Sequence, residues 1–240
     1  MSVIEGEGTH PILYGTYTLP NGSSIVAHIA RPDLGGTYPT VIVAHTARGL
    51  TSAVKALCRH LARHGFAVMA PDLYRGQGRR FDDLDAAAAA FADQGRGPVR
   101  ALEAALDSAR MPGTAWASGA QIGVLALGHG GIPAAAISAT DEEIDALVLA
   151  YVPTDGLDVT LAGTSVPLLG LYAGDDEVAP AAGARSLRSS LGRGEFRIYA
   201  GVGHEFMDDG SETYDRGAAD DALDRVRGFF GSHLGVPAPA

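Results

Sequence analysis

The sequence has one cysteine, no excess of basic charge and no long apolar run, and each absence excludes a class of protein. Cys58 alone cannot form an internal disulfide, so nothing points to an oxidising compartment. The 18 basic residues stand against 28 acidic ones, and a formal charge of −10 disfavours binding to nucleic acid or an anionic membrane. The acidic start, MSVIEGEG, lacks a signal-peptide pattern, and no stretch is long enough to span a membrane. We expect a cytoplasmic protein that binds a small-molecule substrate.

The length and composition favour one globular domain. The chain has 240 residues, 46% of them hydrophobic, which is enough for one sizeable core and short for two independent ones. We find no internal repeat, and the Gly/Pro clusters are short, as expected for turns rather than linkers. We therefore predict a single domain over residues 1–240. A monomer and a homodimer both stay open.

The order of strand-like and helix-like segments predicts the fold class. Two alternating segments, Ile12 to Thr18 and Ser24 to Arg31, flank the turn signal Pro20-Asn21-Gly22 and indicate an antiparallel hairpin. Further along, apolar runs alternate with helix-period stretches; the runs are TVIVAH, FAVMAPD, IGVLALG, ALVLAYV, PLLGLYAG and EFRIYAG. This pattern predicts an α/β fold with a mostly parallel central sheet and helices on both faces. Ligands of such sheets bind at the carboxyl ends of the strands.

Apolar spacing also locates several helices. Val54, Leu57, Cys58 and Leu61 share one helix face, and the helix is expected to start at Thr51 and end at Gly65. Similar spacing predicts helices at 99–106 and 219–230. The Ala-rich stretch from Phe81 to Asp93, after the loop RGQGRR, is either a plain helix or part of a lid. The final VPAPA is expected to be a frayed tail.

The stretch IGVLALGHGG predicts a sharp strand-to-helix turn of the nucleophile-elbow type. In such an elbow a nucleophile stands between small residues placed two positions to either side. Ala126 and Gly130 are the small residues here, so the centre is Gly128, which has no side chain to act as a nucleophile. A register with His129 at the centre would put Leu127 at a small-residue position, and packing disfavours it.

An acid and a histidine follow in the order found in hydrolase triads. Asp176 lies in GDDEVAP and His204 in GHEF, and each motif comes directly after a predicted strand. The positions 128, 176 and 204 therefore give the chain order elbow, acid, histidine. A histidine oriented by a carboxylate is a competent general base near neutral pH. We predict that His204 and Asp176 are the catalytic pair.

The sequence resembles the dienelactone hydrolase family nearly end to end. The resemblance rests on VIVAHTARGL, MAPDLYRGQG, IGVLALGHGG, YAGDDEVAP and YAGVGHEF. It implies an α/β-hydrolase fold and hydrolysis of lactones or small esters by a Cys or Ser, an Asp and a His. Asp176 and His204 match the last two, whereas Gly128 falls where the nucleophile should be. Thr46 is a second departure, because relatives often carry a glutamate there.

Other site residues follow from the resemblance and from their place at strand ends. Arg75 resembles a position that receives an anionic substrate group, and Tyr151 resembles a pocket-lining tyrosine. Backbone N–H groups of His129, Thr46 and Ala47 are candidates for stabilising an oxyanion. Side-chain roles stay open for His129 as a catalytic group and for Thr46 as a hydrogen-bond donor or substitute nucleophile. The remaining predicted substrate contacts are Arg48, Tyr74 and Phe206.

Three functions remain open at this point. The first is a noncovalent His204–Asp176 acid/base enzyme that cyclises, isomerises, eliminates from or adds to a small carbonyl, lactone or polyene substrate. The second is a lactone or ester hydrolase that activates water, or one whose nucleophile has been removed by engineering. The third is a noncatalytic ligand-binding protein on a hydrolase fold. No cofactor is required, and the other histidines lack ligand spacing, so no metal site is predicted.

Overall fold

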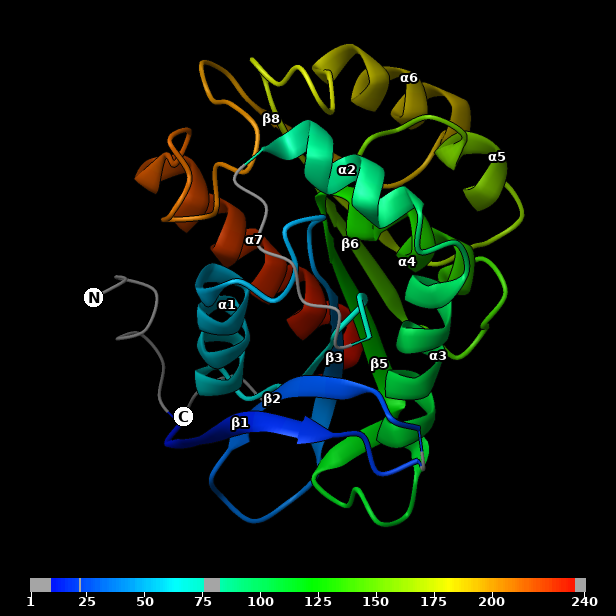
Figure 1. Ribbon diagram of the computed structural model, residues 1–240, viewed down its shortest axis with the longest axis vertical. Coiled ribbons are helices and arrows are strands. Elements are labelled where there is room, and N and C mark those ends of the chain that lie inside the picture. Colours follow the sequence, from blue (N-terminus) through cyan, green and yellow to red (C-terminus); the bar gives the residue numbers. More distant parts are fainter. Residues whose placement is uncertain (1–9, 22, 76–82, 236–240) are drawn as a thin grey trace.

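The computed structural model describes residues 10–21, 23–75 and 83–235. Its strands form one eight-stranded sheet in the order β1-β2-β4-β3-β5-β6-β7-β8 (Figure 1). The strands are β1 (Ile12–Thr18), β2 (Val26–Pro32), β3 (Tyr38–Ala44), β4 (Ala67–Pro71), β5 (Ala117–Leu127), β6 (Ala146–Ala150), β7 (Leu168–Ala173) and β8 (Glu195–Tyr199). β1 and β2 pair antiparallel, β2 pairs antiparallel with β4, and β4, β3 and β5 to β8 are parallel.

The predicted hairpin and the predicted parallel sheet are both confirmed. β1 pairs with β2 from Ile12↔Pro32 to Thr18↔Val26, and Gly22 of the predicted turn lies outside the described residues. Each of the six apolar runs overlaps a strand. β3, β4, β6 and β7 are buried along nearly their whole length, which explains why their sequences are continuously apolar rather than alternating.

Helices cover both faces of the sheet. They are α1 (Ser52–Arg63), α2 (Leu84–Ala92), α3 (Gly97–Arg110), α4 (Gly131–Ser138), α5 (Leu157–Leu161), α6 (Ala181–Leu191) and α7 (Arg216–Leu234). Side chains of α1 and α7 form one apolar core with the sheet, and side chains of α2 to α6 contribute to a second core on the other face (Figure 1). No helix within the described ranges is both long and apolar enough to cross a membrane.

Helix α1 follows the prediction closely. The Thr51 hydroxyl accepts a hydrogen bond from the Val54 N–H and so satisfies a first-turn donor. Leu57, Cys58 and Leu61 are buried on the predicted face. The last helical residue is Arg63, and the chain then reverses through Gly65 at φ +91°, a conformation that glycine adopts without steric cost.

The described part of the Ala-rich stretch forms a helix. α2 begins after Asp83, whose carboxylate accepts hydrogen bonds from the N–H groups of Asp85 and Ala86. Phe81, the loop residues 76–80 and the tail VPAPA lie outside the described residues. A lid role for this stretch therefore stays a prediction.

A buried histidine in β2 gives a testable dependence of stability on pH. His28 is 3% exposed, and neither ring nitrogen has a hydrogen-bond partner among the described residues. Burial, assisted by the positive charge of Lys55, lowers the pKa of His28 from 6.5 to about 4. Between these two pH values the His28 ring binds a proton in the unfolded chain but not in the folded protein. The free energy of unfolding should therefore fall by up to about 3 kcal/mol as the pH drops through this range.

The measurement is urea unfolding at several pH values for the wild type and for His28→Leu. We expect the variant to lose less stability than the wild type between neutral pH and about pH 4, because leucine cannot take up the proton. His233→Leu, at an exposed position of α7, is the matched control and should follow the wild type. Parallel pH profiles for the wild type and His28→Leu would contradict the assignment.

Candidate active site

The loops after five parallel strands meet at one edge of the sheet. The strand register pairs Ala44 with Ala126 and Leu127 with Ala150, so β3, β5 and β6 end at the same level. The loops after β3, β5, β6, β7 and β8 carry the residues on which the sequence analysis focused, which are Thr46, Gly128, Tyr151, Asp176 and His204. The structure therefore places these loops at the carboxyl edge, where α/β sheets bind ligands.

The strand-to-helix turn after β5 has the geometry predicted for an elbow. Gly128 has φ +50° and begins a single 3₁₀ turn that leads into α4. A Cβ atom on Gly130 would lie 2.3 Å from the carbonyl oxygen of His45, and one on Gly131 would lie 2.2 Å from a methyl group of Val152. The elbow thus packs so closely against the ends of β3 and β6 that only glycine fits at these two positions. Because the positive φ falls on Gly128, the turn is centred there and not on His129.

Gly128 itself is surrounded differently from the other two glycines. A Cβ atom there would lie 3.6 Å from Cβ and Cγ2 of Thr46, which is an ordinary contact distance. The methyl group of Thr46 therefore faces the centre of the elbow. Its hydroxyl oxygen accepts a hydrogen bond from the Arg48 N–H at 3.1 Å. This arrangement does not support Thr46 as a substitute nucleophile.

His204 and Asp176 form the hydrogen-bonded pair that their order along the chain predicts. His204 Nδ1 donates to Asp176 Oδ2 at 2.8 Å, and the Asp176 side chain is fully buried. The other carboxylate oxygen accepts hydrogen bonds from the N–H groups of Val178 and Ala179. Burial raises the pKa of Asp176, but the hydrogen bond from His204 and the two backbone donors outweigh it, so the pKa lies below its usual value. The ionised carboxylate holds the ring with its proton on Nδ1.

This tautomer leaves Nε2 of His204 as the basic nitrogen. Among the described residues, no hydroxyl or thiol group is hydrogen-bonded to the ring. The Thr213 hydroxyl donates to the His204 backbone carbonyl instead. The ring is 8% exposed and lies edge-on to the ring of Tyr151, with 5.4 Å between centroids. The pair is therefore complete as an acid/base device but has no protein nucleophile attached to it.

Tyr151 is held rigidly beside the histidine. Its backbone adopts φ +44°, and its ring packs on Phe206 at 5.7 Å. Burial, together with the nearby carboxylates of Glu205 and Asp208, raises the pKa of the Tyr151 hydroxyl well above its usual value. The hydroxyl is therefore a neutral donor throughout the physiological pH range. Tyr151 also lines the cleft described below, and its contact with substrate stays a prediction.

Arg48 is held in an ion pair that the sequence analysis missed. Its Nε donates to Oε2 of Glu205 at 2.9 Å. Glu205 follows His204, is 2% exposed and has φ +58°, a conformation unusual for a residue with a side chain. The two residues are 157 positions apart. The substrate contact predicted for Arg48 stays a prediction, and this pair does not support it.

His129 lies close to His204 under helix α2. Its ring centroid is 6.4 Å from that of Phe91. Burial, with a smaller effect from the charge of His204, lowers the pKa of His129. The lowered pKa favours the neutral form of the His129 imidazole, which lies near enough to His204 to be affected by its charge. The catalytic role of His129 stays a prediction.

Tyr74, Phe206 and Arg75, which were predicted to contact substrate, differ in burial. Tyr74 is 1% exposed, its hydroxyl donates to the Ala47 carbonyl, and burial beside Asp72 raises its pKa to about 12. Phe206 is fully buried beneath Tyr151. These positions suit support of the loops and do not support direct contact with substrate. Arg75 is exposed at φ +55°, next to the part of the chain outside the described residues.

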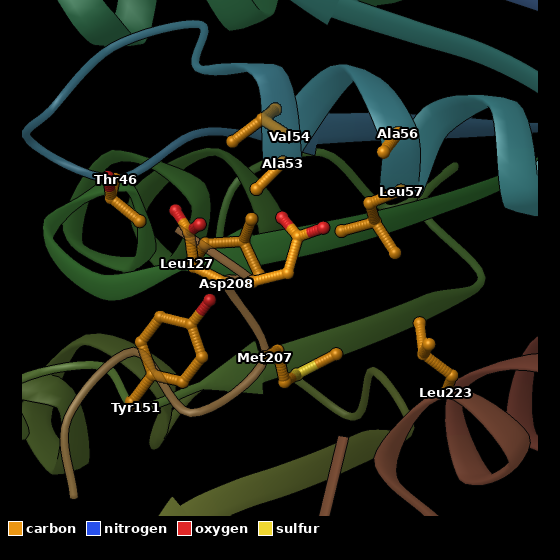
Figure 2. Close-up of a pocket in the computed structure, with 11 residues that line it drawn as sticks. Thr46, Ala53, Val54, Ala56, Leu57, Leu127, Tyr151, Met207, Asp208 and Leu223 are labelled. Carbon is orange, nitrogen blue, oxygen red and sulfur yellow. The ribbon is translucent and has the colours of Figure 1, made fainter. Parts of the chain in front are cut away.

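A small cleft opens beside the catalytic pair, between α1, α7 and the loop that carries His204 (Figure 2). Its volume is about 420 Å³ when the space at its open mouth is included. It shares Thr46 and Tyr151 with the catalytic edge. The other lining residues are Ala53, Val54, Ala56, Leu57, Leu127, Met207, Asp208, Asp209 and Leu223. Asp208 and Asp209 thus border this cleft.

Two further sequence expectations concern nucleophiles and metals. Cys58 is fully buried in α1, and burial raises the pKa of its thiol to about 12, so it cannot replace the missing nucleophile. Within the described ranges, no group of three or more His, Cys, Asp or Glu residues is arranged to hold a metal ion. That no metal is needed stays a prediction.

The comparison with known families decides the assignment. The model of the dienelactone hydrolase family matches residues 25–234. The chain belongs to the dienelactone hydrolase family. The matched range includes Gly128, Asp176 and His204. It confirms the resemblance on which the site was predicted, and members of this family are enzymes.

Individual relatives agree with this assignment. A Yersinia pestis protein, provisionally named a carboxymethylenebutenolidase, is 29% identical over 261 residues, which cover 96% of this chain and 93% of the relative. A Methylorubrum extorquens protein with the same provisional name is 28% identical over 91% of this chain and 81% of its own length. A crystal structure from Klebsiella pneumoniae, of a provisionally named dienelactone hydrolase, has a TM-score of 0.82 at 24% identity and covers 92% and 99% of the two chains. The α/β-hydrolase fold is thereby confirmed.

Proposed function

We propose that this family member uses His204 and Asp176 as a general acid/base pair on a small carbonyl or lactone substrate, without forming a covalent bond to the substrate. One observation carries the proposal: the pair is complete and buried, while the centre of the elbow is a glycine. A covalent ester hydrolase needs a hydroxyl or thiol at that point. The space left at Gly128, bordered by the methyl group of Thr46, is available to a substrate atom or to water.

The preferred reaction is proton transfer at the carbon next to a carbonyl group. Nε2 of His204 removes the proton, and the electron pair moves to the carbonyl oxygen to form an enolate. Asp176 stabilises the imidazolium that results. The enolate can react in three ways. Return of the proton to another carbon gives an isomer, and loss of a leaving group from the neighbouring carbon gives an elimination product. Attack of the enolate carbon on another atom of the same substrate closes a ring.

Backbone N–H groups at the elbow are suited to stabilise the enolate oxygen. The N–H of Ala47 has no acceptor among the described residues. The N–H of His129 lies in the first turn of a helical segment, where the helix itself supplies no acceptor. Removal of one such donor from an oxyanion site typically costs about 10²-fold in rate. These two donors, with Nε2 of His204, define the proposed reaction site.

Hydrolysis by activated water is the second candidate. It is favoured by the hydrolase names of the relatives. In this reaction Nε2 of His204 takes a proton from water, the hydroxide adds to the lactone carbonyl, and the proton passes to the departing oxygen. The same residues are used, but the bond that breaks is the acyl C–O bond and not a C–H bond.

One experiment separates the candidates. The protein is incubated in D₂O with a panel of small ketones, lactones and esters, and NMR follows exchange of the protons next to the carbonyl and appearance of the free acid. We expect exchange or rearrangement, together with no covalent adduct by mass spectrometry after treatment with a phosphonate probe. Acid formation alone supports the hydrolase, and labelling of Thr46 contradicts both. Absence of all turnover, with a ligand that raises the Tm, supports a noncatalytic binding protein.

A further inference from the structure

The cleft beside the catalytic pair combines an apolar wall with acidic residues at its border (Figure 2). Leu57 of α1, Leu127 of β5 and Leu223 of α7 supply apolar surface. Asp208 and Asp209 come from the loop that follows His204; Asp208 is half-buried and Asp209 is exposed. An apolar wall with a few polar groups at one end is typical of a site that orients a small ligand.

Tyr151 supplies an independent indication that this cleft takes a ligand. The residue is only 2% exposed and lines the cleft, and Figure 2 shows its hydroxyl directed into it. The hydroxyl has no hydrogen-bond partner among the described residues. The oxygen opens onto the cleft and is not enclosed by protein atoms, so a ligand or water in the cleft can satisfy it. The same ring touches His204, so whatever contacts this hydroxyl lies next to the catalytic pair.

The charges around the cleft select the ligand. Asp208 and Asp209 are both among the lining residues. Burial, together with the nearby Asp209, raises the pKa of the Asp208 carboxyl above its usual value, although the Gly210 N–H and the Arg48 guanidinium oppose the shift. Arg48 is itself bound to Glu205. One guanidinium therefore stands against three carboxylates, those of Glu205, Asp208 and Asp209. A carboxylate ligand would be repelled here, whereas a cation would be attracted.

We propose that this cleft binds a slender apolar arm of the substrate that ends in a protonated amine. The arm lies along Leu57 and Leu127, and the ammonium group donates to Asp208 and Asp209. The Tyr151 oxygen accepts a further hydrogen bond from the ammonium. This inference rests on the proposed function in one respect. It takes the reacting carbonyl group of the substrate to lie at His204, and the arm to lie on the other side of the Tyr151 ring.

Isothermal titration with three probes of the same length tests the selectivity. Hexylammonium, hexan-1-ol and hexanoate are titrated into the full chain near neutral pH and at low salt. We expect hexylammonium to bind about tenfold more tightly than hexan-1-ol, and hexanoate to bind more weakly than both. Equal affinity for the three probes, or a preference for hexanoate, would overturn the proposal.

Variants locate the binding. The double variant Asp208→Asn, Asp209→Asn should weaken hexylammonium about tenfold and leave hexan-1-ol unchanged. Asparagine retains the oxygen with which Asp208 accepts the Gly210 N–H, so the loop should keep its fold. Ala53→Leu, which fills the cleft from a half-exposed position of α1, should weaken both probes. Asp107→Asn, on the exposed side of α3, is the matched control and should bind like the wild type. Unchanged hexylammonium affinity in the double variant would place the binding elsewhere.

His204→Ala separates this inference from the proposed function. Hexylammonium should still bind to this variant, because the cleft does not depend on the imidazole, whereas proton exchange should be lost. If hexylammonium binds as expected but no carbonyl compound reacts, the proposed function fails and the binding site stands. If carbonyl compounds exchange protons and hexylammonium shows no preference, the binding site fails and the proposed function stands.

Discussion

Gly128→Ser is expected to convert this protein into a covalent esterase. The new hydroxyl would stand at the centre of the elbow, where family members carry their nucleophile, with His204 and Asp176 already hydrogen-bonded. Nucleophile, base and orienting acid act as a unit, so supplying the missing member restores a large part of the rate. We expect hydrolysis of an activated ester to rise at least about 10²-fold over the wild type. A phosphonate probe should then label residue 128.

The structure indicates that the substitution can be tolerated. A Cβ atom at Gly128 would make ordinary contacts of 3.6 Å with Thr46. The backbone at φ +50° costs a residue with a side chain about 1–2 kcal/mol, which a stable domain can absorb.

Gly128→Ala is the matched control, because it introduces the same Cβ atom and the same backbone cost but no hydroxyl. A gain in esterase activity with serine and none with alanine would assign the effect to the nucleophile. If Gly128→Ser folds like Gly128→Ala and yet shows neither activity nor labelling, Gly128 does not occupy the nucleophile position. The noncovalent proposal would then lose its main support.

The sheet was predictable from the sequence because its strands are buried on both sides. Parallel strands covered by helices must be apolar along their whole length, and residues 146–150 and 168–173 read as continuous apolar runs for that reason. The elbow and the hydrogen-bonded His204–Asp176 pair were predictable too, because Gly128, Asp176 and His204 each lie within a few residues of a strand end. Parallel order then brings these strand ends to one edge.

Contacts between distant loops left no comparable signal. Arg48 and Glu205 are separated by 157 residues, and neither lies in a pattern that identifies the other as its partner. The position of Glu205 next to His204 in GHEF was visible, but its burial and positive φ arise from the path of the folded loop. The interior positions of Tyr74 and Phe206 were missed for the same reason: a motif gives the place of a residue in the chain and not the direction of its side chain.

His204→Ala should abolish turnover by the wild-type protein. The imidazole is the base in both the proton-transfer and the water-activating reaction, so either should fall by about 10³-fold. Asp176→Asn should cause a loss of similar size for a different reason. The asparagine oxygen can still accept from Val178 and Ala179, as Oδ1 of Asp176 does. Its NH₂ group would then face His204 and force the ring proton onto Nε2, the nitrogen that must be basic.

The measurement is steady-state kinetics on the substrate that the D₂O proton-exchange experiment identifies. Circular dichroism verifies that each variant is folded. His233→Ala, at an exposed histidine of α7, is the control and should retain full activity. A normal rate in His204→Ala would show that the buried His204–Asp176 pair only ties two loops together, since no other residue could supply the proposed proton transfer at Nε2. Because Asp176→Asn preserves most of the loop's hydrogen bonds, a loss there with retained folding argues for chemistry rather than for structural support.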